Sequence, residues 1–123
     1  AACGIEASPA LHHDAVNAVA RLEPDVQARL FLHCGDIFSV QGEWRQATTI
    51  FVSSAGFDDG TMARLSQGLQ TVQEGTRVAA LHRALSADPR QAPAGFTLAR
   101  QAAYCTGGTG NSSVYLYRKG GLC

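Results

Sequence analysis

Short apolar runs recur through the first half of the chain. Residues 2–5, 29–33 and 49–52 are such runs, and each is followed within three residues by an acidic or hydroxyl residue, which is typical of strands. The stretch 41–43 between the last two runs is polar and predicts a loop. The run 49–52 then breaks into Ser53-Ser54-Ala55-Gly56-Phe57-Asp58-Asp59. A β-branched and aromatic run bounded by turn residues predicts a strand buried on both faces.

One amphipathic stretch lies between the first two of these strands, and a second follows the third. Ser8-Pro9 is typical of a helix start, with serine as the N-cap and proline in the first turn. Apolar residues then recur at helical spacing until Pro24, at Leu11, Ala15, Val19 and Leu22. A second helix is expected after Asp58 and Asp59, because negative charge suits a helix N-terminus. Its apolar stripe is Met62, Leu65, Leu69 and Val72, and Gly75 is a C-terminal cap signal.

The second half of the chain predicts three more strands. Residues 76–81 form the fourth strand, and 86–95, with two prolines, form an exposed loop. Residues 96–104 and 113–117 are strands on either side of the glycine-rich stretch 106–112. Because that stretch lies between two strands, it predicts a hairpin loop rather than a phosphate cradle. The order β-α-β-β-α-β-β-β predicts an α/β fold with parallel strands first and an antiparallel hairpin last.

Composition limits the classes of function. A length of 123 residues allows one domain, and a net charge of zero gives no electrostatic grip on nucleic acid or anionic lipid. No apolar run approaches the roughly 20 residues that span a bilayer. The four cysteines form no CxxC pair and are expected to be reduced thiols of an intracellular protein. The set His12, His13, His33 and Cys34 matches no structural zinc spacing, so no metal site is predicted.

Two acidic residues follow the first two strands. Glu6 ends one strand and Asp36 follows the next, so parallel strands would bring both to the same sheet edge. A carboxylate offers two acceptor oxygens to the vicinal hydroxyls of a ribose. A second carboxylate could accept from an adenine amine while Ile37 or Phe38 packs on the ring. The alternative is a solvated acid before a helix and ordinary turn chemistry at Gly35-Asp36. Together the acids favour an adenosine-containing ligand.

The end of the strand 49–52 is the first place to look for chemistry. In open α/β sheets, ligands lie in the crevice beyond the carboxyl ends of the strands, which here means Ser53 to Phe57. The alternative is an ordinary strand-to-helix connection, for which serine, glycine and aspartate are the usual residues.

A set of motifs in order resembles one enzyme class. The motifs are Cys3-Gly4-Ile5-Glu6, Gly35-Asp36-Ile37-Phe38-Ser39 with Trp44-Arg45, Ile50-Phe51-Val52, and Gln73-Glu74-Gly75-Thr76-Arg77-Val78. They resemble class I S-adenosylmethionine-dependent methyltransferases, most closely the non-SET histone lysine methyltransferases of the disruptor-of-telomeric-silencing type. The resemblance runs from about Gly4 to Arg118. It implies a Rossmann-like, mostly parallel sheet with a C-terminal antiparallel hairpin, a protein substrate such as a histone or nucleosome, and a nuclear location.

The resemblance also implies roles for single residues. Glu6 would hold the cofactor ribose, and Asp36 the adenine amine with Ile37 beside it. Ser53 stands where the family has the first of two asparagines that line the lysine channel and the cofactor, and Phe57 matches a channel aromatic. The last hairpin of the family is similar to Tyr104-Cys105-Thr106-Gly107 and the stretch 113–116.

The sequence departs from the family at three places. Ser53-Ser54 replaces the asparagine pair, and Val114 replaces an aromatic near the target lysine. The first strand and its glycine-rich turn, which would lie between the strands of Glu6 and Ile50, have no counterpart. We therefore expect residues 1–123 to be the C-terminal part of a single methyltransferase domain. Two alternatives stay open: a class I methyltransferase acting on another protein or a small molecule, and a degenerate, non-catalytic adenosine-binding or interaction domain.

Overall fold

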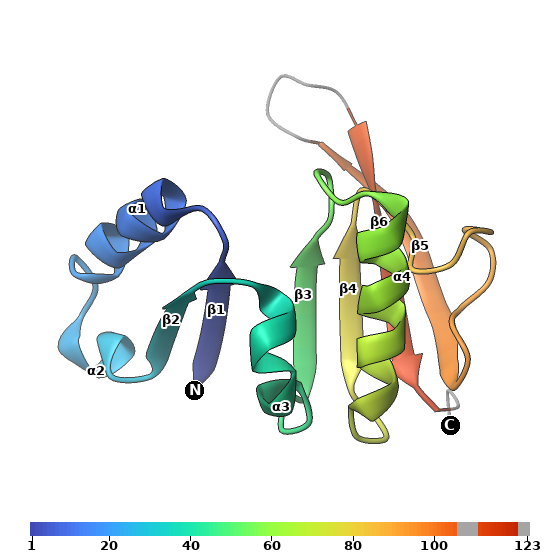
Figure 1. Ribbon diagram of the computed structural model, residues 1–123, viewed down its shortest axis with the longest axis horizontal. Coiled ribbons are helices and arrows are strands. Elements are labelled where there is room, and N and C mark those ends of the chain that lie inside the picture. The colour runs from blue at the N-terminus through green and yellow to red at the C-terminus, as the bar shows by residue number, and fades with distance from the viewer. Residues whose placement is uncertain (106–110, 121–123) are drawn as a thin grey trace. The chain divides into compact units, whose positions relative to one another are not determined.

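The computed structural model describes residues 1–105 and 111–120, which form two compact units. The first unit comprises residues 1–41 and the second residues 42–123. Both units contain a parallel strand pair and helices, and the second also contains antiparallel strands. The prediction of an α/β fold is therefore confirmed (Figure 1). No helix in the described part of the chain is both long and apolar enough to cross a membrane.

The first unit is a parallel strand pair joined by helices. Strand β1 (Ala2–Glu6) pairs with β2 (Leu30–Cys34) so that Ala2 lies opposite Leu30 and Glu6 opposite Cys34. Helix α1 (Pro9–Val19) connects them, and the Ser8 hydroxyl accepts a hydrogen bond from the Leu11 amide at 3.3 Å, as its N-cap role predicts.

Two predicted boundaries in this region are wrong. Pro24 does not stop the first helix, which ends at Val19; Pro24 instead begins a short helix, α2 (Pro24–Gln27), because proline is favoured in a first helical turn. The polar stretch 41–43 is not a loop. It belongs to helix α3 (Gln41–Trp44), which follows a 3₁₀ turn over Ile37–Val40 capped by Asp36.

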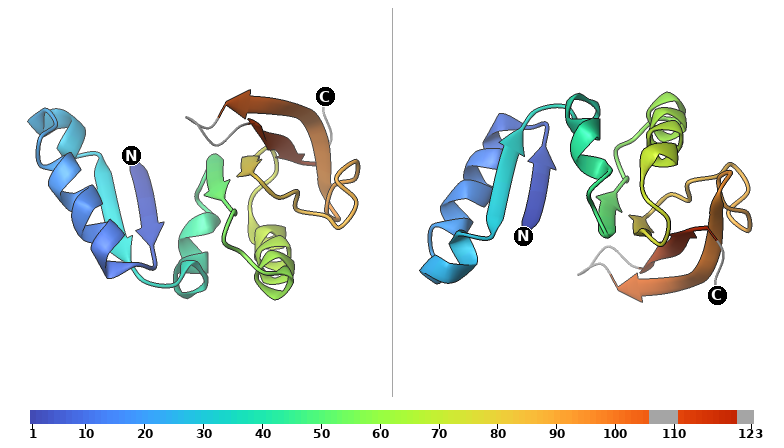
Figure 2. Two further views of the ribbon diagram at one scale, coloured as in Figure 1. Left: turned by 90° about the horizontal axis from the view of Figure 1, so that it is seen from above. Right: turned by 90° about the horizontal axis from the view of Figure 1, so that it is seen from below.

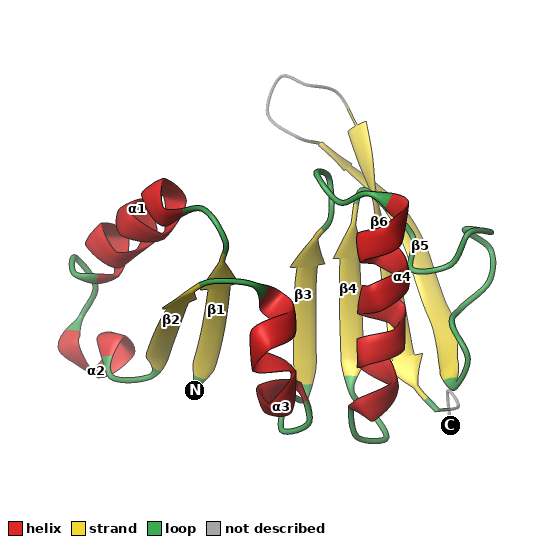
Figure 3. Cartoon of the chain, in the orientation of Figure 1, coloured by secondary structure: helices red, strands yellow, loops and turns green. Residues whose placement is uncertain are grey.

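The second unit contains a four-stranded sheet of order β3-β4-β6-β5. Its strands are β3 (Thr49–Ser53), β4 (Arg77–Leu81), β5 (Phe96–Cys105) and β6 (Asn111–Lys119). Strand β4 runs parallel to β3 and antiparallel to β6, so the last strand is inserted between β4 and β5 (Figure 2). The stretch from 86 to 95 between β4 and β5 contains no helix or strand, as predicted (Figure 3).

Helix α4 (Asp59–Gly68) covers one face of this sheet (Figure 2). All four residues of its predicted apolar stripe are buried, namely Met62, Leu65, Leu69 and Val72. Val78 and Tyr117, which pair across β4 and β6, are buried as well. Gly75 is not the cap of this helix, which ends at Gly68; Gly75 has φ +84° and lies in the turn before β4.

The prediction that the strand 49–52 is buried on both faces is wrong. Strand β3 is at the edge of its sheet, with β4 as its hydrogen-bonded neighbour, so it is not a central strand. Its residues alternate: Ile50 and Val52 are half-buried, whereas Phe51 is 68% exposed. The apolar run therefore reflects strand propensity at an edge rather than burial on two faces.

Candidate functional site

Glu6 and Asp36 lie at the same edge of their parallel strand pair. Glu6 is opposite Cys34 in the register, and the Gly35 amide donates to the Glu6 carbonyl oxygen at 2.9 Å. The prediction that the two strand-end acids share one sheet edge is therefore confirmed. Asp36 is exposed, while Glu6 and Ile37 are half-buried.

Each of these carboxylates also has a local structural role. Glu6 Oε1 accepts from the Ser8 amide at 2.9 Å, and Asp36 Oδ1 accepts from the Phe38 amide at 2.9 Å. A carboxylate has about four acceptor positions, so one backbone bond leaves capacity for ligand hydroxyl or amine donors. The alternative interpretation, in which these acids only cap the chain that follows them, accounts for the two bonds observed.

Ser53 and Ser54 differ sharply at the end of β3. Ser53 pairs with Leu81 in the register and is exposed, so its hydroxyl faces solvent at the carboxyl edge of β3 and β4. Ser54 is completely buried. Its hydroxyl donates to the Leu81 carbonyl oxygen at 2.6 Å and accepts from the Arg83 amide at 3.3 Å. Of the two serines, only Ser53 is open to solvent.

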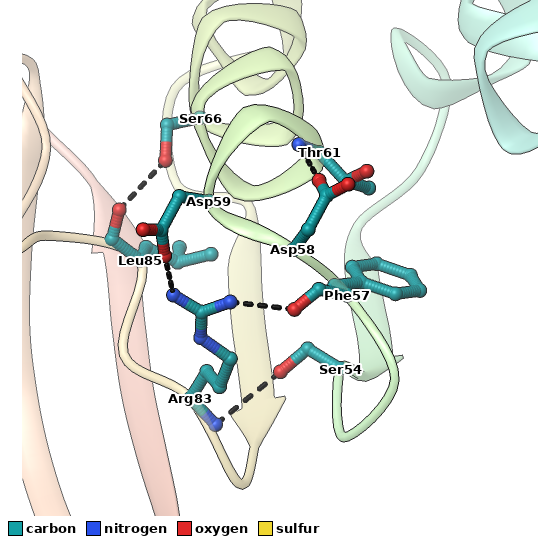
Figure 4. Close-up of polar contacts among 8 residues, drawn as sticks. All are labelled: Ser54, Phe57, Asp58, Asp59, Thr61, Ser66, Arg83 and Leu85. Atoms are coloured by element: carbon teal, nitrogen blue, oxygen red, sulfur yellow. Dashed lines mark hydrogen bonds and ion pairs between the residues drawn. The ribbon is translucent and has the colours of Figure 1, made fainter.

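Phe57 is held by backbone contacts at the start of α4. It is half-buried, and its amide donates to the Ser54 carbonyl oxygen at 3.1 Å. The next residue, Asp58, caps the helix by accepting from the Thr61 amide at 2.7 Å (Figure 4). That hydrogen bond to the charged carboxylate lowers the pKa of Asp58 below its ordinary value of 3.8.

Sequence reasoning missed three polar residues near the carboxyl ends of β3 and β4. Arg83 reaches the Phe57 carbonyl oxygen at 2.5 Å and an Asp59 carboxylate oxygen at 2.5 Å (Figure 4). His82 Nδ1 lies 2.5 Å from the hydroxyl oxygen of Ser112, and its amide donates to the Ser113 carbonyl oxygen at 2.9 Å. The rule that pointed to Ser53, applied to the strand 76–81, would have pointed to His82 and Arg83. Ser112 gives no such signal, since only the β4–β6 pairing brings it there.

The structure thus groups the predicted residues into two sets. Glu6, Asp36 and Ile37 are together in the first unit, and Ser53 and Phe57 are together in the second. Val114 is half-buried in β6, opposite Leu81. The side chains of Tyr104 and Cys105 lie outside the described part. Of the stretch 106–112, for which a hairpin loop was predicted, residues 106–110 lie outside it as well, whereas Asn111 and Ser112 belong to β6 and not to a loop.

A hollow of about 230 Å³ lies at the opposite, amino-terminal end of β3 and β4. It is lined by Thr48 and by the stretch 73–76. The side chains of Gln73 and Thr76 both donate to the Ala47 carbonyl oxygen, at 3.2 and 3.1 Å. These two donors therefore connect the amino-terminal ends of the strands and are not available to a ligand in the hollow.

Comparison with known proteins does not add a relative. No protein-family model matches the chain, and a search of curated proteins finds no similar sequence.

Proposed function

We propose that this chain is the C-terminal part of a class I S-adenosylmethionine-dependent methyltransferase domain that methylates lysine in a protein, with histones as the substrate class. The observation that best supports the proposal is the strand order β3-β4-β6-β5, in which an antiparallel last strand is inserted beside two parallel strands. That arrangement agrees with the mostly parallel sheet and terminal hairpin that the sequence motifs imply.

Three residues of the first unit suit an adenosine group, and two residues of the second unit suit an acceptor channel. The carboxylate of Glu6 would accept from the ribose hydroxyls, and that of Asp36 from the adenine amine, with Ile37 against the ring. Ser53 and Phe57 would line the channel for the acceptor amine. S-adenosylmethionine, when bound, would supply an activated methyl group for the acceptor amine. The chain's own part is orientation and exclusion of water rather than acid–base chemistry.

The first test replaces Glu6 by glutamine in the full-length protein. The amide oxygen of glutamine can still accept from the Ser8 amide, so local folding should be kept. Loss of charge-assisted bonds to the ribose should weaken cofactor binding by about 1.5–3 kcal/mol, measured by isothermal titration. Glu23→Gln, at an exposed acid of the same unit, is the control. A dissociation constant that is the same for wild type and Glu6→Gln would leave Glu6 only its local capping role.

The second test concerns Ser53. Asparagine offers a carbonyl and an amide where serine offers one short hydroxyl, so Ser53→Asn should raise turnover on nucleosomes. Ser53→Ala should lower it by about 0.5–1.5 kcal/mol of transition-state stabilisation, the value of one hydrogen bond. Transfer of labelled methyl groups measures all three proteins. Equal turnover of wild type and Ser53→Ala would make Ser53 a simple turn residue.

A degenerate, non-catalytic domain is the second candidate, and one observation favours it. The Ser54 hydroxyl is fully buried and satisfied by Leu81 and Arg83, so position 54 offers nothing to a ligand. This candidate predicts cofactor or adenosine binding without turnover in wild type, Ser53→Asn or Ser53→Ala. A class I methyltransferase with another protein or a small molecule as acceptor would instead show turnover once that acceptor is supplied.

A further inference from the structure

The turn after β3 is tied to the turn after β4 by side-chain contacts. Ser54 bonds the Leu81 carbonyl oxygen and the Arg83 amide. The Arg83 guanidinium bonds the Phe57 carbonyl oxygen and Asp59 (Figure 4). All four contacts connect residues 54–59 to residues 81–83. The Phe57 main chain is therefore held by Arg83, 26 residues further along the chain, as well as by the hydrogen bond from its own amide to the Ser54 carbonyl oxygen.

The contacts of Arg83 differ in strength. The ion pair is weak, because the Asp59 side chain is 98% exposed and the Arg83 side chain 37% exposed, so water and salt screen it. The bond to the Phe57 carbonyl oxygen is partly buried and charge-assisted, which makes it the stronger contact. It also fixes backbone, whereas the ion pair joins one side chain to another.

The backbone that directs Arg83 is itself held firmly. His82 has φ +75°, a left-handed conformation that residues other than glycine rarely adopt. Hydrogen bonds from its amide to Ser113 and between its ring and Ser112 hold it on β6. Unfavourable backbone conformations persist only where surrounding contacts impose them. The backbone of the turn 81–83 is thus held in place, and it directs the Arg83 side chain toward Phe57.

We propose that Arg83, supported by Ser54, is a positioning residue that fixes Phe57 at the wall of the acceptor channel. The position of the channel rests on the proposed function; the fixing of Phe57 by Arg83 does not. The Phe57 ring follows its main chain, so loosening the carbonyl contact loosens the aromatic wall. Ligand groups at Glu6 and Asp36 are held by other residues and are unaffected.

The test of the positioning is amide exchange in Arg83→Gln. Glutamine removes the charge and replaces the five-donor guanidinium fork with a shorter side chain that ends in a single amide. The Phe57 amide, which bonds Ser54, should exchange about three- to tenfold faster, because it is released by local opening of the turn. The Val78 and Tyr117 amides in the core should keep their rates. Arg90→Gln is the matched control, because Arg90 pairs with Asp88 in the loop after β4. Equal Phe57 exchange in wild type and Arg83→Gln overturns the proposal.

A second readout separates positioning from general structural support. In the full-length protein, Arg83→Gln should raise KM for the nucleosome by about threefold or more while the cofactor dissociation constant stays unchanged. Arg83→Lys, with one ammonium in place of the fork, should fall between wild type and Arg83→Gln. Equal fold-changes in KM and in cofactor affinity would overturn the assignment to the acceptor channel. Faster Phe57 exchange in a protein whose wild type transfers no methyl group would reject the proposed function and leave the fixing of Phe57 standing.

Discussion

Three buried polar side chains in or next to the four-stranded sheet each form a hydrogen bond with the backbone. Ser54 bonds Leu81, Thr76 bonds Ala47, and the hydroxyl of Tyr117 accepts from the Leu85 amide at 2.9 Å. No buried side-chain polar atom among the described residues is without a partner. Burial raises the pKa of Tyr117 above its ordinary value of 10.0, because a buried phenolate would be poorly solvated. At the residue scale, these contacts hold the ends of the strands in register.

Tyr117→Phe tests one of these contacts. The ring is kept, but the amide of Leu85 loses its acceptor, and Leu85 is only 5% exposed. An unsatisfied buried donor costs about 1–3 kcal/mol, and the free energy of unfolding should fall by that amount in a urea titration. Tyr115→Phe is the control, because the described contacts include no hydrogen bond of the Tyr115 hydroxyl. Similar small losses in both variants would show that the Leu85 amide finds another acceptor.

At the scale of elements, the sheet of the second unit is unequal on its two faces. Val78 and Tyr117 are buried on the face that α4 covers, whereas Phe51 and Leu116 are 68% and 36% exposed. Phe51 is opposite Ala79, and Ala79 is opposite Leu116, so these residues share one face across three strands. Packing energy is therefore concentrated between α4 and one side of the sheet.

Truncating one side chain on each face of the sheet measures this difference in packing energy. Leu65 is 1% exposed in α4, and Leu65→Ala should cost about 2–5 kcal/mol, the lost transfer energy plus that of the cavity. Phe51→Ala removes a larger side chain from the exposed face and should cost less than about 1 kcal/mol. Both values come from urea unfolding followed by circular dichroism. A loss at Phe51 as large as that at Leu65 would mean that the open face is packed in solution.

At the scale of the whole molecule, the two units differ in their cores. None of residues 1–41 is buried, whereas the core residues of the second unit include Leu65, Leu69, Val78 and Tyr117. A unit of about 40 residues rarely folds stably without a disulfide, a metal or a partner surface. The stability of the chain therefore resides mainly in the second unit.

Amide exchange should show this directly. Amides of β2 should exchange through local opening at a lower free energy than amides of β4 and β6, because little apolar surface is buried around β2. Mass spectrometry of exchange at neutral pH compares peptides from the two units. Equal protection of β2 and β4 would contradict the expectation and indicate that both units unfold together.

The sequence by itself determined most of the strands, the two longer helices and one shared edge. Strand runs, the Ser8 cap and the stripe from Met62 to Val72 are set by local chemistry and periodicity, and all appear in the structure. The common edge of Glu6 and Asp36 follows from parallel pairing alone. Helix ends were less predictable, because Pro24 and Gly75 each suit more than one place near a helix or a turn.

Tertiary structure decided the features that depend on pairing between strands far apart in the sequence. An apolar run such as 49–52 has the same sequence at the centre of a sheet and at its edge, so only the observed pairing shows that Phe51 is exposed. The burial of Ser54, the left-handed His82 and the contact of Arg83 with Phe57 depend on residues 26 to 30 positions apart. Local patterns carry no information about such partners, because the contacts form only when β4 lies between β3 and β6.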